Sequence, residues 1–250
     1  MSPRQIDQST LVERENVLLD AAMLLIKQQG VEGLTMDKLV KQVSFSKGTI
    51  YNHFTCKEDL MLGLCNRGMG LLGALFTRAG KFEGTTRERI IAIHFAYLLY
   101  SRLYPMMFML VISAKSPGVT EKASTRNREM HLQLEASLTT GIINIICQAL
   151  TEGECNNPNN LAPEQIAFAN WSSAFGTIAL LSKDFEQCGI RAQMQSEQAL
   201  LANVNLMLDG LQWQPLFSEF DYTQTLERLR CEVFAPEIAL LAAQEQALQC

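Results

Sequence analysis

The residues best suited to chemistry in this 250-residue chain lie within one short stretch near the N-terminus. They offer a cation, hydroxyl groups, an amide, an imidazole and a glycine: Lys47, Gly48, Thr49, Tyr51, Asn52 and His53. Lysine and hydroxyl groups hold phosphate oxygens, an amide pairs with a base edge, and a glycine permits close backbone approach. Lys57 adds a charge where a further helix is expected to begin, beside backbone N–H groups that can receive a phosphate. The set predicts contact with nucleic acid.

Two short helices joined by a three-residue turn are expected to position these groups. Thr35 and Ser46 each precede a short amphipathic segment, so each is a predicted helix N-cap. In the second segment Ile50 and Phe54 lie one turn apart and are expected to pack against the first, which leaves the other residues facing outward. A preceding helix is expected to end at Gly30, where a left-handed residue is favoured. This arrangement is typical of a helix-turn-helix.

The motif from Leu34-Thr35, through Ser46-Lys47-Gly48-Thr49-Ile50-Tyr51-Asn52-His53-Phe54, to Lys57-Glu58-Asp59-Leu60 resembles the DNA-binding domain of the tetracycline-repressor (TetR) family of bacterial regulators. The resemblance covers about residues 12–60. It implies that Gly48 and Asn52 lie nearest base edges, and that six residues mostly hold phosphates: Thr35, Lys47, Thr49, Tyr51, His53 and Lys57. Ser44 stands where the family commonly has a glycine, so the turn there is expected to be less left-handed or mildly strained.

Beyond Gly80 the helical pattern continues, and no alternating run is long enough for a convincing strand, so the predicted fold class is all-α. Helices are expected at about 87–103, 105–114, 118–152, 163–187, 193–209 and 222–247. Residues 1–60 are predicted to form a three-helix head with the helix-turn-helix, and about 57–80 a connecting helix. By the resemblance, 81–250 would form a helical domain that senses an unidentified small-molecule effector and dimerises. A repressor that is released by this effector, and a palindromic double-stranded operator, are implied.

Two segments of the second domain are candidates for these roles. A stripe of small residues and an apolar face of the next helix would form the interface of a homodimer: Ala169, Ser172, Ser173, Gly176, Leu201, Val204 and Leu208. Tight packing within one subunit is the alternative. Aromatic rings, methionines and one cation would line an apolar pocket with a polar anchor: Phe95, Tyr100, Arg102, Tyr104, Met107 and Phe108. Ordinary core packing is the alternative for this set.

Composition limits the remaining possibilities. The net charge of −5 provides no global basic field, so DNA binding would depend on where a few lysines lie. The seven cysteines show no C-x-x-C pair and the three histidines are far apart, so no metal and no cofactor are expected. The N-terminus does not look like a secretory signal, which predicts a cytoplasmic protein. The apolar stretch 90–113 contains His94, Arg102 and Pro105, which argues against a membrane span.

The segment Gly68-Met69-Gly70-Leu71-Leu72-Gly73 satisfies the dinucleotide pattern G-x-G-x-x-G. It lies inside an expected helix and follows no strand, so close helix packing is the preferred explanation. No grouping typical of a catalytic site stands out, and the chain is not expected to be an enzyme. The alternative function is a helical adaptor whose N-terminal hairpin binds protein, and salt dependence separates the two, since phosphate binding weakens steeply as salt rises.

Overall fold

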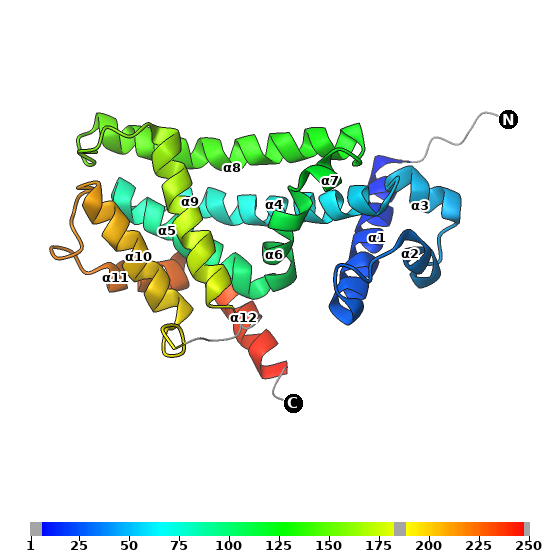
Figure 1. The fold of residues 1–250 in the computed structure, drawn as a ribbon. Helices are drawn as coiled ribbons and strands as arrows, with labels where there is room; N and C mark the ends of the chain where they lie inside the picture. The colour runs from blue at the N-terminus through cyan, green and yellow to red at the C-terminus, as the bar shows by residue number, and fades with distance from the viewer. Residues whose placement is uncertain (1–6, 183–188, 248–250) are drawn as a thin grey trace. The chain divides into compact units, whose positions relative to one another are not determined.

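The computed structural model describes residues 7–182 and 189–247, and in these ranges the regular elements are helices (Figure 1). An isolated antiparallel bridge between Cys155 and Trp213 is the one strand-like pairing described. The all-α prediction is confirmed. The chain divides into two compact units, one made of residues up to Met69 with Met106–Leu134, and one of Gly70–Pro105 with the residues from Glu135 on. The first unit thus contains a segment, 106–134, that lies outside the predicted head.

The first unit begins with three helices, α1 (Gln8–Gln29), α2 (Met36–Gln42) and α3 (Lys47–His53), followed by the N-terminal part of α4 (Lys57–Gly80). Helix α1 ends as expected, because Gly30 takes a φ of +73° and its N–H bonds to the carbonyl of Ile26. The core of these helices is formed by fully or almost fully buried apolar side chains: Leu18, Leu19, Ala22, Leu25, Leu34, Leu39, Ile50, Phe54 and Leu60.

Glycines in α4 have two different roles. A Cβ atom at Gly63 would lie 2.6 Å from Cε1 of the buried Phe54 ring, so close packing requires a glycine here. A Cβ at Gly70 would meet nothing within 4 Å, and one at Gly73 would lie at an ordinary 3.8 Å from Leu138. The G-x-G-x-x-G segment does lie inside a helix, as predicted, but packing does not account for Gly70 or Gly73.

The expected helix at 118–152 is wrong, because the chain forms α7 (Pro117–Thr120) and then α8 (Thr125–Thr151). A buried carboxylate explains the break. Oδ1 of Asp59 accepts hydrogen bonds from Ser124 N (3.0 Å), Ser124 Oγ (2.8 Å) and Asn127 Nδ2 (2.6 Å). Burial raises the pKa of Asp59, but hydrogen bonds from Thr55, Asn127 and Ser124 outweigh it, so its pKa lies below the usual value. The helix is interrupted at residues 121–124, and the interruption lets Ser124 and Asn127 donate to the Asp59 carboxylate.

The second unit is built around α5 (Thr86–Leu103), which is buried on nearly every side. A capping box starts it, since Thr85 N donates to Glu88 Oε2 at 2.9 Å and Glu88 N to Thr85 Oγ1 at 3.2 Å. The chain breaks at Tyr104, as the proline predicts, and α6 (Pro105–Ala114) belongs to the first unit from Met106 on. The second unit also holds α9 (Pro163–Leu180), α10 (Ser196–Gly210), α11 (Tyr222–Arg228) and α12 (Ala235–Ala247). Helix α9 ends before 187, and 183–188 lie outside the described residues.

A single helix over 222–247 was expected, and this is also wrong. Between α11 and α12 the chain makes a π-helical turn (Leu229–Val233), closed by a bond from Phe234 N to Leu229 O at 2.8 Å. Both side chains are fully buried, and the Phe234 ring lies 5.9 Å from that of Phe95 on α5. The wider turn lets both side chains reach the core, which a regular helix with period 3.6 would not allow at this spacing.

Arg87 fastens the C-terminal part of the chain to α5. Its guanidinium is fully buried, lies 2.7 Å from a carboxylate oxygen of Asp209 and donates to the carbonyl of Trp213 (2.5 Å) and to Oδ1 of Asn205 (2.8 Å). The Tyr222 ring lies 5.0 Å from it. Because removal of one partner would leave a buried charge, this cluster is a strong local constraint on residues 205–222.

By length and composition alone, two of the described helices, α4 and α8, could cross a membrane, and α5 with α6 would count as a third only if the broken pair were one span. Within the structure 61% of the apolar window of α4 is buried, as in a core helix, against 17% of that of α8.

Candidate nucleic-acid interface and cavity

Helices α2 and α3 each begin at the N-cap residue that the sequence predicts. Ser46 Oγ accepts the N–H of Thr49 at 3.2 Å, and Thr35 Oγ1 accepts the N–H of Lys38 at 3.3 Å, so both predicted N-caps are confirmed. Ile50 and Phe54 are fully buried, as expected. Outside glycine, positive φ values occur among the described residues at 157, 160 and 212, so Ser44 is not left-handed, which confirms the first of the two expectations for this turn.

The outward side of α3 is polar and open. Lys47, Gly48 and Asn52 are exposed, and Tyr51 is partly so. The Lys47 ammonium lies 5.6 Å from the centroid of the Tyr51 ring and 3.7 Å from a carboxylate oxygen of Asp37. Because the side chains of Lys47 and Asp37 are 65% and 82% exposed, this ion pair is weak and leaves the lysine free to reorient.

Three further predicted residues flank this surface. Thr35 is exposed beside the start of α2. The Thr49 hydroxyl lies 2.9 Å from Ser46 Oγ, so it is already engaged in the cap. Lys57 is partly exposed and its ammonium donates to the carbonyl of Glu32 at 3.4 Å. These side chains come from separate turns of the motif, and all retain some solvent exposure.

The prediction that His53 faces outward is wrong. The residue is 7% exposed, and its Nδ1 lies 4.0 Å from a carboxylate oxygen of Glu15 on α1. Burial lowers its pKa, although Glu15 opposes the shift. The reason is helical geometry, since positions 50 and 53 are three residues apart and share the buried face of α3. His53 therefore supports the packing of α1 on α3.

The predicted dimer residues divide into two groups. Val204 and Leu208 on α10 are buried within the subunit itself, at 1% and 0% exposure, so their assignment to an interface with a partner is wrong. The remaining predicted residues keep some exposure: Ala169, Ser172, Ser173, Gly176 and Leu201. The structure also leaves exposed four large apolar side chains on the same two helices, which are not among the seven predicted interface residues: Phe168, Trp171, Leu180 and Leu206. Leu206 lies two positions from Val204 and from Leu208, so it points to the opposite face of α10.

The predicted pocket residues pack mainly as core, which favours the alternative given for this set. Phe95, Tyr100, Met107 and Phe108 are buried, while Arg102 and Tyr104 are partly buried. Arg102 donates to Glu197 at 3.4 Å and to Ser196 at 3.3 Å. Of the six, Phe95 lines a described cavity, and this cavity measures only about 20 Å³.

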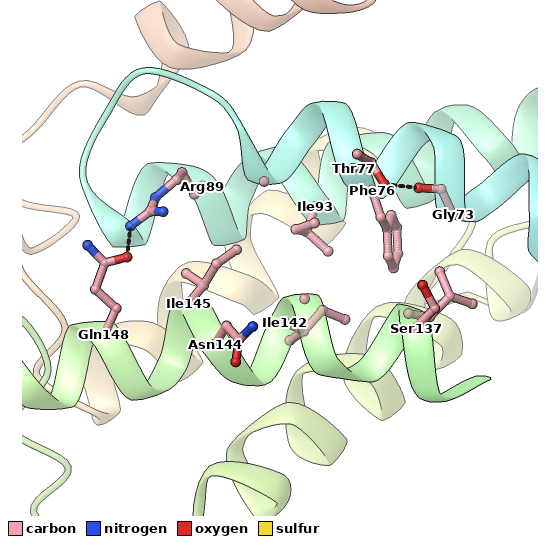
Figure 2. Close-up of a pocket in the computed structure, with 13 residues that line it drawn as sticks. Gly73, Phe76, Thr77, Arg89, Ile93, Ser137, Ile142, Asn144, Ile145 and Gln148 are labelled. Carbon is pink, nitrogen blue, oxygen red and sulfur yellow. Dashed lines mark hydrogen bonds between the residues drawn. The ribbon is translucent and has the colours of Figure 1, made fainter. Parts of the chain in front are cut away.

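A cavity of about 330 Å³ lies elsewhere in the second unit, between the C-terminal part of α4, α5 and α8 (Figure 2). It is lined by apolar side chains, small residues and a few polar groups: Gly73, Phe76, Thr77, Gly80, Arg89, Ile93, Ser137, Leu138, Gly141, Ile142, Asn144, Ile145 and Gln148. Its size is at the lower end of the range for ligand pockets. The sequence analysis missed it, although Leu138, Ile142 and Ile145 recur at the spacing of one helix face.

Arg89 is the one cation among the lining residues of this cavity. Its Nη2 donates to Oε1 of Gln148 at 2.6 Å, and its Nε is buried without a hydrogen-bond partner in the described structure. No group of three or more His, Cys, Asp or Glu in the described ranges could hold a metal ion. The chemistry that this cavity offers is binding by shape, apolar contact and one positive charge.

Residues 18–64 match the family described as bacterial regulatory proteins, tetR family. The "Fatty acid metabolism regulator protein" of Bacillus subtilis is 25% identical over 139 residues, which are 54% of this chain and 66% of that protein. The "Nucleoid occlusion factor SlmA" of Vibrio campbellii is 31% identical over 110 residues, 43% of this chain and 48% of that protein. The chain thus spans about half to two thirds of the length of these curated relatives.

Solved structures share the fold over most of the chain. The TetR family regulator PfmR from Thermus thermophilus superposes with a TM-score of 0.58 at 19% identity, covering 78% of this chain and 98% of that one. FadR from Bacillus subtilis in complex with stearoyl-CoA gives 0.59 at 16% identity, covering 77% and 97%. AibR in complex with isovaleryl coenzyme A and operator DNA gives 0.56 at 20% identity, covering 78% and 98%. The helix-turn-helix head followed by a helical domain is therefore the fold of these regulators as well.

Proposed function

Because this chain belongs to the TetR family of bacterial regulatory proteins, we propose that it is a transcription regulator, and not an enzyme, that binds operator DNA through α3 and releases it when a small molecule occupies the cavity. The observation that carries the proposal is the open polar surface of Lys47, Gly48 and Asn52 on a helix that is capped and packed as a helix-turn-helix requires. Repression in the bacterial cytoplasm is the mode of action that we propose.

The residues of α3 would have distinct roles on DNA. Lys47 and Lys57 supply charge to phosphates, and Thr35, Thr49 and Tyr51 supply hydroxyl groups. Asn52 is exposed and can donate to and accept from an adenine edge in the major groove, while the absence of a side chain at Gly48 lets the backbone of α3 come close to the base edges.

A homodimer would present two copies of α3 to the duplex. The four exposed apolar side chains on α9 and α10 named above support this part of the proposal, because such a surface on neighbouring helices is typical of an interaction site. Ala169, Ser172 and Gly176 would let the helices of two subunits approach closely. A two-fold axis would place the recognition helices on successive major grooves about 34–36 Å apart or somewhat more, which implies a palindromic operator.

The cavity is the proposed effector site. Two regulators of the same fold are described in complex with coenzyme A thioesters, which supports a small organic effector for this chain. Helices α4 and α8 each contribute residues to both units and both line the cavity. We propose that a ligand between α4 and α8 shifts α4, and with it the separation of the two copies of α3.

Selection of bound duplexes from a random DNA pool tests the proposal. The wild type is compared with the double variant Lys47→Ala, Tyr51→Ala and with the control Lys81→Ala, which removes an exposed charge in the second unit. Enrichment of a palindrome by the wild type and the control, but not by the double variant, is the expected result. If neither the wild type nor the control enriches a sequence at low salt, the adaptor function becomes the better explanation.

A further inference from the structure

We infer that the ligand of the cavity is an amphipathic anion, whose carboxylate pairs with Arg89 and whose apolar body lies along α8. The inference concerns the chemical class of the effector. It rests on the proposed function only where it says that this ligand releases DNA.

Arg89 differs from five other arginines of its unit in lacking a carboxylate partner in the described structure. Five arginines of the second unit form ion pairs with acidic side chains: Arg78, Arg87, Arg102, Arg228 and Arg230. Arg89 forms none in the described part of the chain, and its one hydrogen bond is to the neutral amide of Gln148. Glu152 reaches the other side of this amide, where it accepts from Gln148 Nε2 at 2.9 Å, and it makes no ion pair with the guanidinium. The guanidinium is thus left without a direct counter-charge.

The Arg89 guanidinium lies at one end of the cavity. Figure 2 shows Arg89 and Gln148 together at one end, with Phe76 and Ser137 toward the other and Ile93, Ile142 and Ile145 between them. The Thr77 hydroxyl is already bound to the carbonyl of Gly73 at 2.8 Å. A ligand would therefore meet a cation at one end and, along its length, apolar side chains together with the amide of Asn144, which is complementary to an acid on a mainly apolar chain.

Planar donors favour a carboxylate at this position. A guanidinium presents N–H groups in a fork that matches the two oxygens of a carboxylate, and the unpartnered Nε adds a donor that Gln148 leaves unused. A partly buried charge without a counter-ion is unfavourable, so an anion would relieve a penalty that the free protein carries. A neutral or cationic ligand of the same shape would not.

The volume limits the size of the ligand. A water-sized group takes about 30 Å³ in a liquid, so 330 Å³ accommodates about eleven groups of that size. Octanoate to decanoate, with about ten to twelve non-hydrogen atoms, fills this space. A coenzyme A thioester has several times as many atoms and would have to leave most of them outside.

Calorimetric titration of the full chain separates these ligands. The ligands are octanoate, octanol, octylammonium and octanoyl-coenzyme A, and the proteins are the wild type, Arg89→Gln, Arg89→Lys and the exposed control Arg128→Gln. We expect octanoate to bind the wild type and the control, and Arg89→Gln to weaken octanoate by about tenfold to a hundredfold while changing octanol by less than about twofold. Arg89→Lys should restore part of the loss.

Three outcomes would overturn the inference: equal affinity of octanol and octanoate, equal weakening of both by Arg89→Gln, or binding of octanoyl-coenzyme A alone. The wild-type ligand series decides the question even if Arg89→Gln does not fold. Release of the selected operator is then measured separately. Octanoate that binds without releasing DNA would leave this inference intact and refute effector release, whereas DNA binding without octanoate binding would refute this inference alone.

Discussion

Replacement of Lys47 by alanine should lower the salt dependence of operator binding, not only the affinity. In the free protein Lys47 is 65% exposed, and its ion pair with Asp37 is an exposed pair worth at most about 1 kcal/mol. It therefore costs little to transfer this charge to a phosphate. Each phosphate that a protein neutralises on B-DNA contributes about −0.9 to the slope of log K against log salt concentration.

Two of the proposed phosphate contacts in each subunit are lysines, Lys47 and Lys57. A dimer would then neutralise about four phosphates through them, for a slope of about −3.6, and Lys47→Ala would reduce it to about −1.8. Between about 50 and 200 mM salt these slopes correspond to losses of about 150-fold for the wild type and about 12-fold for the variant.

Fluorescence anisotropy with the selected operator over a series of potassium chloride concentrations measures both slopes. Lys81→Ala is the matched control, because it removes the same charge from an exposed position in the second unit and should leave the slope unchanged. A Lys47→Ala line parallel to that of the wild type would refute the assignment of Lys47 to a phosphate. An unchanged affinity as well would mean that the Lys47 side chain makes no contact with DNA.

Three further predictions concern a buried histidine, two glycines of α4 and the proposed dimer interface. Burial lowers the pKa of His94 from 6.5 to about 4, against the opposing effect of its hydrogen bond to Asn170. The neutral imidazole therefore contributes fully to the stability of the fold above pH 6.5, and this contribution is lost as the pH falls toward 4, so urea titrations should show the wild type losing about 2 kcal/mol more than His94→Gln between about pH 7.5 and pH 5. Equal losses of stability in the two proteins would contradict the buried neutral state. In α4, thermal denaturation should show that Gly70→Ala stabilises the protein by about 1 kcal/mol, whereas Gly63→Ala does not stabilise it, because the new Cβ would collide with the Phe54 ring. Equal gains in stability would show that the Phe54 ring moves aside freely. Leu206→Arg should convert a dimer to monomers in sedimentation equilibrium while the exposed control Leu240→Arg does not, and an unchanged mass would remove α10 from the interface.

The helix-turn-helix could be predicted because its determinants are local. A Ser or Thr that caps a helix acts on an N–H three residues away, and the pairs that bury one face of a short helix lie within one turn. Thr35, Ser46, Ile50 and Phe54 therefore occupy the predicted positions. The all-α class followed in the same way from repeated periodicity and from the proline and glycine breaks.

Features that depend on distant parts of the chain were missed. The spacing of three residues from Ile50 allows His53 to share the buried face of α3, but only the contact with Glu15 on α1 shows that this side of the helix is covered. The break before α8 comes from Asp59, which is 65 residues away from Ser124, and Gly63 is explained only by the Phe54 ring packed on it. No short-range pattern in the sequence carries these contacts.

The sequence by itself determined the class of protein, because the residues that would meet DNA lie together within about twenty-five positions. Only the tertiary structure decided which residues could meet a ligand. A cavity forms where α4, α5 and α8 fail to fill the space between them, and the charge of Arg89 stands out there because no carboxylate from any described element reaches it. Whether an arginine is paired depends on which helix faces it, and this is settled only when the helices pack.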